Sequence, residues 1–157
     1  MRKSIGQLAT SLVVAATAAA ADTADHSAVE KAAHQAHEAY VEAINSNDVD
    51  TMMPTVTDDI VYIAPNSPAV IGRAAVRAWL QDYFSTFRSH WEKTSVEFVV
   101  TGEWAFEHYT YKSLDRPTAG GADVKDSGNG INIYHHDTDG TWRVARDAWA
   151  TDQPPTK

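Results

Sequence analysis

The last apolar run of the sequence, "TWRVARDAWATD" at 141–152, places a carboxylate between two tryptophans. Strand alternation puts Arg143, Ala145, Asp147 and Trp149 on one face, and Trp142, Val144, Arg146 and Ala148 on the other. Two interpretations of Asp147 are open. It pairs with an arginine and orders the strand, or it lies in an apolar pocket beside Trp149, where desolvation makes a carboxylate a stronger base.

A run near the N-terminus, 25–50, carries a tyrosine and histidines at helical spacing. Three- and four-residue steps put one set of side chains on a single helix face, namely Ala33, His37, Tyr40, Val41 and Ile44. Tyr40 and His37 are therefore either core residues with satisfied polar atoms or ligand contacts. A metal site is not expected, because helical zinc ligands favour an i, i+4 histidine pair, and no motif supplies a third ligand.

The remaining candidates are aromatic residues and one histidine. His108 lies in "WAFEHYTY", a strand with aromatic residues on both faces, which predicts one face toward a pocket and the other toward a partner subunit. His108 is a candidate for acid–base work, with burial in the core or an interface as the alternative. Further ligand-binding candidates are Tyr62, Trp79 and Phe84, together with Trp149.

The elements that must position these residues follow from periodicity and turn signals. We expect helices over 25–46, 49–56 and 73–87, and strands over 58–65, 92–102, 103–115, 126–136 and 141–152. The last two strands are joined by "DTDG", a strong hairpin signal. Helices before a run of hairpin-linked strands predict an α+β fold. We expect a cone: a curved mixed or antiparallel sheet around a long N-terminal helix, with two further helices and one open-ended pocket.

Composition excludes several classes of function. The 157 residues carry a formal net charge of −8 and have no basic run, which argues against binding to nucleic acid or an anionic membrane. There is no cysteine, which removes disulfides, thiolate nucleophiles and cysteine-based zinc sites. Neither a glycine-rich phosphate loop nor a Gly-x-Ser-x-Gly motif is present, so nucleotide chemistry and serine hydrolysis are not indicated.

The first residues have the pattern of an export signal. A basic start is followed by an alanine-rich apolar run that ends in Ala-x-Ala patterns, which predicts a secretory signal peptide over 1–21 and a periplasmic or secreted protein. A membrane anchor is the alternative, but polar residues interrupt the run. We expect a linker over 22–28, a domain over 29–152 and a loose tail over 153–157.

Four motifs, in order, carry a family resemblance: "AYVEAINSNDVDTMM", "TDDIVYIAP", "IGRAAVRAWL" and "DGTWRVARDAW". The chain resembles the nuclear-transport-factor-2-like superfamily, in its SnoaL-like and ketosteroid-isomerase-like branch, over about 29–152. This fold serves isomerases, cyclases, epoxide hydrolases, dehydratases, assembly modules and non-catalytic binders. The resemblance also implies a homodimer formed through the outer face of the sheet.

The resemblance assigns roles to individual positions. Tyr40 matches the tyrosine that donates to the oxyanion in ketosteroid isomerases, and Asn132 matches their second donor. Their base would fall at Ala64, so steroid isomerisation is disfavoured. Asp147 matches the last-strand acid of limonene-type epoxide hydrolases and SnoaL-like cyclases. The histidines of the carbonic anhydrases with this fold are missing here.

Two hypotheses follow for the function. In the first, an exported domain binds a small, largely apolar molecule and performs cofactor-free isomerase, hydratase, dehydratase or epoxide-hydrolase chemistry. Asp147 is then the base, directly or through a water, while Tyr40 and Asn132 stabilise negative charge. In the second, the same cone is a non-catalytic dimeric module that holds a ligand or a partner.

Overall fold

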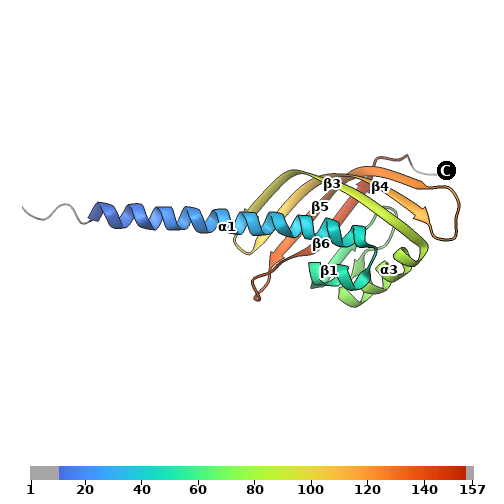
Figure 1. The fold of residues 1–157 in the computed structure, drawn as a ribbon, viewed down its shortest axis with the longest axis horizontal. Coiled ribbons are helices and arrows are strands. Elements are labelled where there is room, and N and C mark those ends of the chain that lie inside the picture. Colours follow the sequence, from blue (N-terminus) through green and yellow to red (C-terminus); the bar gives the residue numbers. More distant parts are fainter. Residues whose placement is uncertain (1–10, 155–157) are drawn as a thin grey trace, which may run out of the picture.

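The computed structural model describes residues 11–154, with side chains described from residue 27 onward. Three α-helices and six strands follow one another in this part of the chain (Figure 1). The elements are α1 (Ser11–Ser46), α2 (Val49–Met52), the 3-10 helix η1 (Met53–Thr55), β1 (Val56–Ile63), β2 (Val70–Ile71), α3 (Arg73–Thr86), β3 (Phe87–Thr101), β4 (Trp104–Pro117), β5 (Val124–His136) and β6 (Trp142–Thr151).

Helix α1 is longer than the helix expected from the sequence. It runs without a break through 22–28, the predicted linker, and its N-terminal part projects beyond the sheet (Figure 1). Residues 1–10 of the predicted signal peptide and 155–157 of the predicted tail lie outside the described residues. Among the described residues, no helix is both long and apolar enough to cross a membrane.

The turn after α1 follows the polar sequence "NSND". Asn47 adopts a left-handed backbone conformation, with φ of 55°, and reverses the chain. The Asp48 carboxylate then accepts a hydrogen bond from the Asp50 backbone N–H at 2.8 Å and caps α2. This turn brings the end of α1 and the start of β1 to the same end of the molecule.

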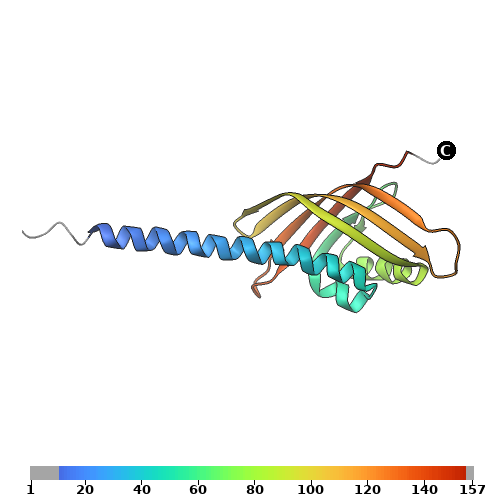
Figure 2. The same cartoon turned by 45° about the horizontal axis from the view of Figure 1, so that its top comes forward.

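The strands form one mixed sheet in the order β2-β1-β6-β5-β4-β3. The β1–β6 pair is parallel and the other pairs are antiparallel. Helices α1 and α3 lie on the same side of the curved, unclosed sheet (Figures 1 and 2). The core lies between these helices and the sheet and includes Tyr40, Val76, Leu80 and Tyr134. The predicted α+β cone is confirmed.

The short strand β2 has no counterpart among the five expected strands, and β3 and β6 differ from expectation in detail. Strand β3 begins at Phe87, directly at the end of α3, because Phe87 and Arg88 already pair with the far end of β4. In β6, simple alternation is wrong. The pairing shifts between Ile133 and Tyr134, which pair with Arg146 and Val144, so Ala145 is the extra residue of a β-bulge.

The bulge changes which side chains of β6 share a face. Trp142 and Val144 lie in the core with Trp149 packed against it, although alternation put them on opposite faces. Arg143, expected beside Asp147, instead bonds to Asp137 and Asp139 at the end of the hairpin. An extra residue reverses the inside–outside pattern once, so the apolar residues on both sides of the bulge face the helices.

Candidate functional site

Three polar residues stand in a row across three neighbouring strands on the concave face. Glu107 of β4 pairs in register with Asn132 of β5, which pairs with Asp147 of β6. Glu107 and Asn132 are 0% exposed and Asp147 is 4% exposed. Buried polar groups are unfavourable unless they are hydrogen-bonded. The partners of this row therefore define the polar chemistry of the cone.

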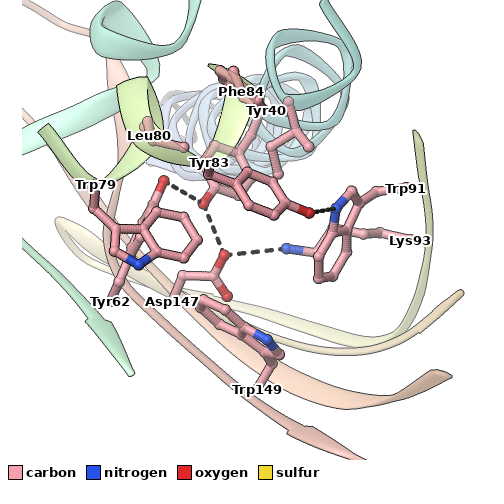
Figure 3. Close-up of a pocket in the computed structure, with 11 residues that line it drawn as sticks. Tyr40, Tyr62, Trp79, Leu80, Tyr83, Phe84, Trp91, Lys93, Asp147 and Trp149 are labelled. Carbon is pink, nitrogen blue, oxygen red and sulfur yellow. Dashed lines mark hydrogen bonds and ion pairs between the residues drawn. The ribbon is translucent and has the colours of Figure 1, made fainter. Parts of the chain in front are cut away.

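Asp147 accepts from two tyrosine hydroxyls. The Tyr40 hydroxyl donates to Oδ2 and the Tyr109 hydroxyl donates to Oδ1, each at 2.7 Å. The ammonium of Lys93 lies 3.4 Å from Oδ2. Figure 3 shows the Tyr40 and Lys93 contacts converging on the same carboxylate. Two carboxylate oxygens have about four acceptor positions, so this carboxylate keeps capacity for a further donor.

A second hydroxyl extends this network toward α3. The hydroxyl oxygens of Tyr62 and Tyr40 are 3.0 Å apart. Because Tyr40 has a single hydroxyl proton and its shorter bond leads to the carboxylate, Tyr62 supplies the proton of this second bond. Tyr62, Tyr40 and Asp147 thus form a hydrogen-bonded chain.

The tyrosines of this network remain neutral donors. Burial raises the pKa of Tyr40, and the nearby Asp147 charge raises it further. The same two causes, in the same order, raise the pKa of Tyr62 and of Tyr109. A hydroxyl that keeps its proton can donate to a carboxylate or to an oxyanion.

Lys93 comes from the edge strand β3, yet its side chain is only 1% exposed. Its ammonium lies 3.8 Å from the centroid of the Tyr109 ring and 4.9 Å from that of Tyr40. Burial lowers the pKa of Lys93, while the charges of Asp147 and Glu107 act in the opposite direction. The site therefore combines a buried carboxylate with a buried amine.

The cavity beside this pair is small and mostly apolar. Its volume is about 30 Å³, room for roughly two or three waters. Figure 3 shows its walls around Asp147 and Lys93. The lining residues are Tyr40, Ile44, Tyr62, Trp79, Leu80, Tyr83, Phe84, Trp91, Lys93, Asp147 and Trp149.

A larger recess of about 360 Å³ lies outside this cavity. Four aromatic side chains line both spaces: Trp79, Tyr83, Trp91 and Trp149. The Trp79 ring contacts Trp149 edge-on at 6.5 Å between centroids, and Trp91 contacts Trp149 edge-on at 6.3 Å. These rings therefore stand between the outer recess and the Asp147 carboxylate.

Glu107 has partners of its own, from α1 and β5. His37 Nδ1 lies 2.9 Å from both Glu107 carboxylate oxygens, and the Tyr134 hydroxyl donates to Oε2 at 2.7 Å. Burial by itself would raise the pKa of Glu107, but the hydrogen bonds from His37 and Tyr134 hold it below its usual value of 4.5. This pair joins α1 to the sheet beside the Asp147 network.

The comparisons with known proteins give the family of this chain. The family model of the SnoaL-like domain matches residues 37–145. The chain belongs to the SnoaL-like domain family. Among curated proteins, no relative gives a significant match to this SnoaL-like sequence.

Solved structures share the fold of this SnoaL-like domain. A ketosteroid isomerase-like protein from Erwinia carotovora atroseptica is 24% identical, with a TM-score of 0.73 over 80% of this chain and 97% of that one. A Streptomyces avermitilis protein, whose name suggests a dehydratase of the NTF2-like family, is 18% identical, with a TM-score of 0.69 over 79% and 97%. A Novosphingobium aromaticivorans protein, whose name suggests a scytalone dehydratase, is 18% identical, with a TM-score of 0.69 over 78% and 83%.

The SnoaL-like fold brings most of the sequence candidates together. Six of them line the small cavity: Tyr40, Tyr62, Trp79, Phe84, Asp147 and Trp149. Asn132 lies next to Asp147 in the row but donates to Tyr134 at 3.1 Å and does not line the cavity. His37 is engaged by Glu107. His108 lies on the opposite, convex face of β4, because its neighbours Glu107 and Tyr109 are the concave-facing residues.

Three polar residues around Asp147 and Asn132 were not among the candidates: Lys93, Glu107 and Tyr109. The signal for two of them was present, since Ala105, Glu107, Tyr109 and Tyr111 alternate along one face of β4. Lys93 had no such signal, because β3 is mostly exposed. Among the described residues, no group of three or more acidic or histidine side chains is arranged to hold a metal ion.

Proposed function

We propose that this SnoaL-like domain binds a small, largely apolar molecule in its cone and transfers protons on it without a cofactor, with Asp147 as the base. One observation carries the proposal: a carboxylate that is 4% exposed borders an aromatic cavity and has an ammonium and two hydroxyl groups on its oxygens. A buried carboxylate beside fixed donors can take a proton while the donors stabilise the negative charge that develops.

The chemistry divides among three groups. Asp147 removes a proton from a carbon next to a carbonyl, or from a water that opens an epoxide. Lys93 and Tyr40 are the donors for the substrate oxygen that gains negative charge. Both already lie beside the reacting carboxylate, since Lys93 Nζ is 3.4 Å and the Tyr40 hydroxyl 2.7 Å from Asp147 Oδ2. Isomerisation, dehydration and epoxide opening share this first step, and names suggesting dehydratases among the structural neighbours support the same class.

The test measures proton transfer on two simple probes. Exchange of the α-hydrogens of 1-tetralone is followed by NMR in heavy water, and hydrolysis of styrene oxide is followed by chromatography. We expect Asp147→Asn to lower whichever rate the protein accelerates by about 10²–10⁴-fold, the usual range for loss of a general base. Asp59→Asn is the matched control, since its carboxylate is 69% exposed and pairs with Arg146 on the surface. Equal rates for the wild type and Asp147→Asn contradict the proposal.

Binding without turnover is the alternative, and the mostly apolar lining of the small cavity favours it. A volume of about 30 Å³ admits a ring only if the aromatic side chains move. In this case 1-tetralone quenches tryptophan fluorescence with saturation, and neither exchange nor epoxide opening rises above the buffer rate. Trp149→Ala then weakens binding, while the Asp147→Asn variant binds with a changed affinity and is equally inactive.

We further propose that the protein acts outside the cytoplasm and as a homodimer. The export proposal rests on the signal pattern at 1–21, and N-terminal sequencing of the protein from the periplasmic or secreted fraction tests it. The dimer proposal is supported by Ile63, Phe106 and Ile131 on the convex face, which are 47%, 39% and 48% exposed.

A further inference from the structure

The ammonium of Lys93 is buried with few hydrogen-bond partners. Among the residues that the structure describes, the acceptor recorded for its Nζ is Asp147 Oδ2, at 3.4 Å. A charge-assisted N–H···O bond is usually about 2.7–2.9 Å long, so this contact is weak. Three N–H groups therefore share a single distant acceptor in a side chain that is 1% exposed. Such a cation is poorly compensated.

The other contacts of Nζ are aromatic faces. The rings of Tyr109 and Tyr40 stabilise a cation in part, but they accept no proton. The balance is reflected in the pKa of Lys93, which burial lowers even though the Asp147 and Glu107 charges oppose the change. Burial thus disfavours the charged form of this side chain, and the neighbouring carboxylates oppose that effect.

The position of the amine is as important as its charge. Lys93 lines the cavity together with aromatic side chains, and Asp147 lies beside its Nζ as a proton acceptor (Figure 3). The cavity volume of about 30 Å³ admits roughly two or three non-hydrogen atoms. That is the size of the reacting end of a small aldehyde or ketone.

We propose that Lys93 is a carbonyl-binding amine that forms an imine with small apolar aldehydes and ketones in the cone. Asp147 first takes a proton from the Lys93 ammonium. The nitrogen lone pair then attacks the carbonyl carbon, a C–N bond forms, and the carbonyl oxygen takes the proton back from Asp147. A second N–H proton passes by way of Asp147 to this oxygen, which leaves as water. The product is a protonated imine, so no net proton, oxidant or reductant is required.

This inference extends beyond proton transfer by Asp147 on a bound molecule, and it requires no turnover. An imine makes the neighbouring C–H bond more acidic, so the two functions are compatible. Their tests are independent, because one measures a covalent adduct on Lys93 and the other measures exchange or hydrolysis of a probe.

The experiment traps the imine on the wild-type protein. Acetaldehyde and sodium cyanoborohydride are added at neutral pH, and N-ethylated lysines are located by peptide mass spectrometry after short exposures. We expect Lys93 to be modified several-fold faster than the exposed Lys112 and Lys125, because only the Lys93 amine is held at the cavity beside a proton acceptor. In protein unfolded with guanidinium, we expect this preference to disappear. Lys93 that stays unmodified while Lys112 and Lys125 react would overturn the proposal.

A pair of variants checks the assignment. Lys93→Met should abolish the fast-reacting site, and Lys112→Met, on the neighbouring strand, should leave it intact. If Lys93→Met fails to fold, the site is still decided by the wild-type peptide map and by its dependence on folding.

Discussion

Gly130 of β5 allows Tyr109 to reach Asp147. A Cβ atom at this glycine would lie 2.2 Å from Tyr109 Cζ and 2.3 Å from its hydroxyl oxygen. It would also lie 2.8 Å from the carbonyl oxygen of Ala148. The ring of Tyr109 therefore passes directly over Gly130 on its way to the carboxylate. Replacing Gly130 by alanine must move the ring, the strand or both.

The structure predicts that Gly130→Ala lowers the free energy of unfolding, the opposite of the usual effect of this substitution in a strand. Gly→Ala in a strand usually stabilises a protein by about 0.5–1 kcal/mol. Overpacking usually destabilises by about 1–3 kcal/mol, and loss of a hydrogen bond to a charged group by about 1.5–3 kcal/mol. For Gly130→Ala we therefore expect a loss of about 2–5 kcal/mol in the free energy of unfolding. Tyr109→Phe removes only the hydroxyl contact with Asp147 and should cost about 1.5–3 kcal/mol.

Urea denaturation followed by tryptophan fluorescence measures these values, and a double-mutant cycle separates them. In the Gly130→Ala/Tyr109→Phe double variant, the hydroxyl bond can be lost only once. The two single effects should thus sum to more than the double effect, by about 1.5–3 kcal/mol. A stabilised Gly130→Ala variant, or strictly additive effects, would refute the proposed route of the Tyr109 ring.

Three further predictions concern charge and assembly. The pKa of Glu107 is lowered in the folded protein, so the ionised Glu107 stabilises the fold above its unfolded pKa, and this contribution is lost as the pH falls through the folded value. Below about pH 4.5, the melting temperature of Glu107→Gln, followed by calorimetry, should therefore fall less steeply than that of the wild type. Ile131→Asp on the convex face should give a monomer by light scattering and Thr138→Asp, in the exposed hairpin turn, should not; two dimeric variants would argue against this interface. Lys93→Met should lower the free energy of unfolding in urea less than Asp147→Ala does. In Lys93→Met the Asp147 carboxylate keeps two hydroxyl donors, whereas in Asp147→Ala the buried Lys93 ammonium loses its recorded acceptor, a loss that typically costs about 3–5 kcal/mol. The opposite order would contradict this account of the pair.

The sequence could predict the elements and the identity of the acid, because both depend on local patterns. The spacing around Tyr40 and the composition of 141–152 were sufficient to place one on the long helix and the other on the last strand. Their contact could be expected only from the family resemblance, since 107 positions separate them in the chain.

The parts that could not be predicted depend on single-residue shifts and on curvature. The bulge at Ala145 reverses the face of Trp142 and Val144, and nothing in "RVARD" marks it. The sequence offers His108 as a candidate and gives no reason to single out Glu107, because aromatic residues on both faces of the strand do not show which face is concave. Lys93 is buried only because the sheet curves over it, which is a property of the whole fold.

The parallel pairing of β1 with β6 has a consequence for the synthesis of the chain. β1 has two neighbours, the two-residue strand β2 and the strand β6, whose residues are the last of the sheet to be made. Until Trp142–Thr151 have left the ribosome, β1 has little to pair with, and the Tyr40 hydroxyl lacks its carboxylate. Contacts between such distant segments form late and slowly. A chain truncated before β6 should therefore lack the Asp147 site and also leave β1 and β2 without a link to the other strands of the sheet.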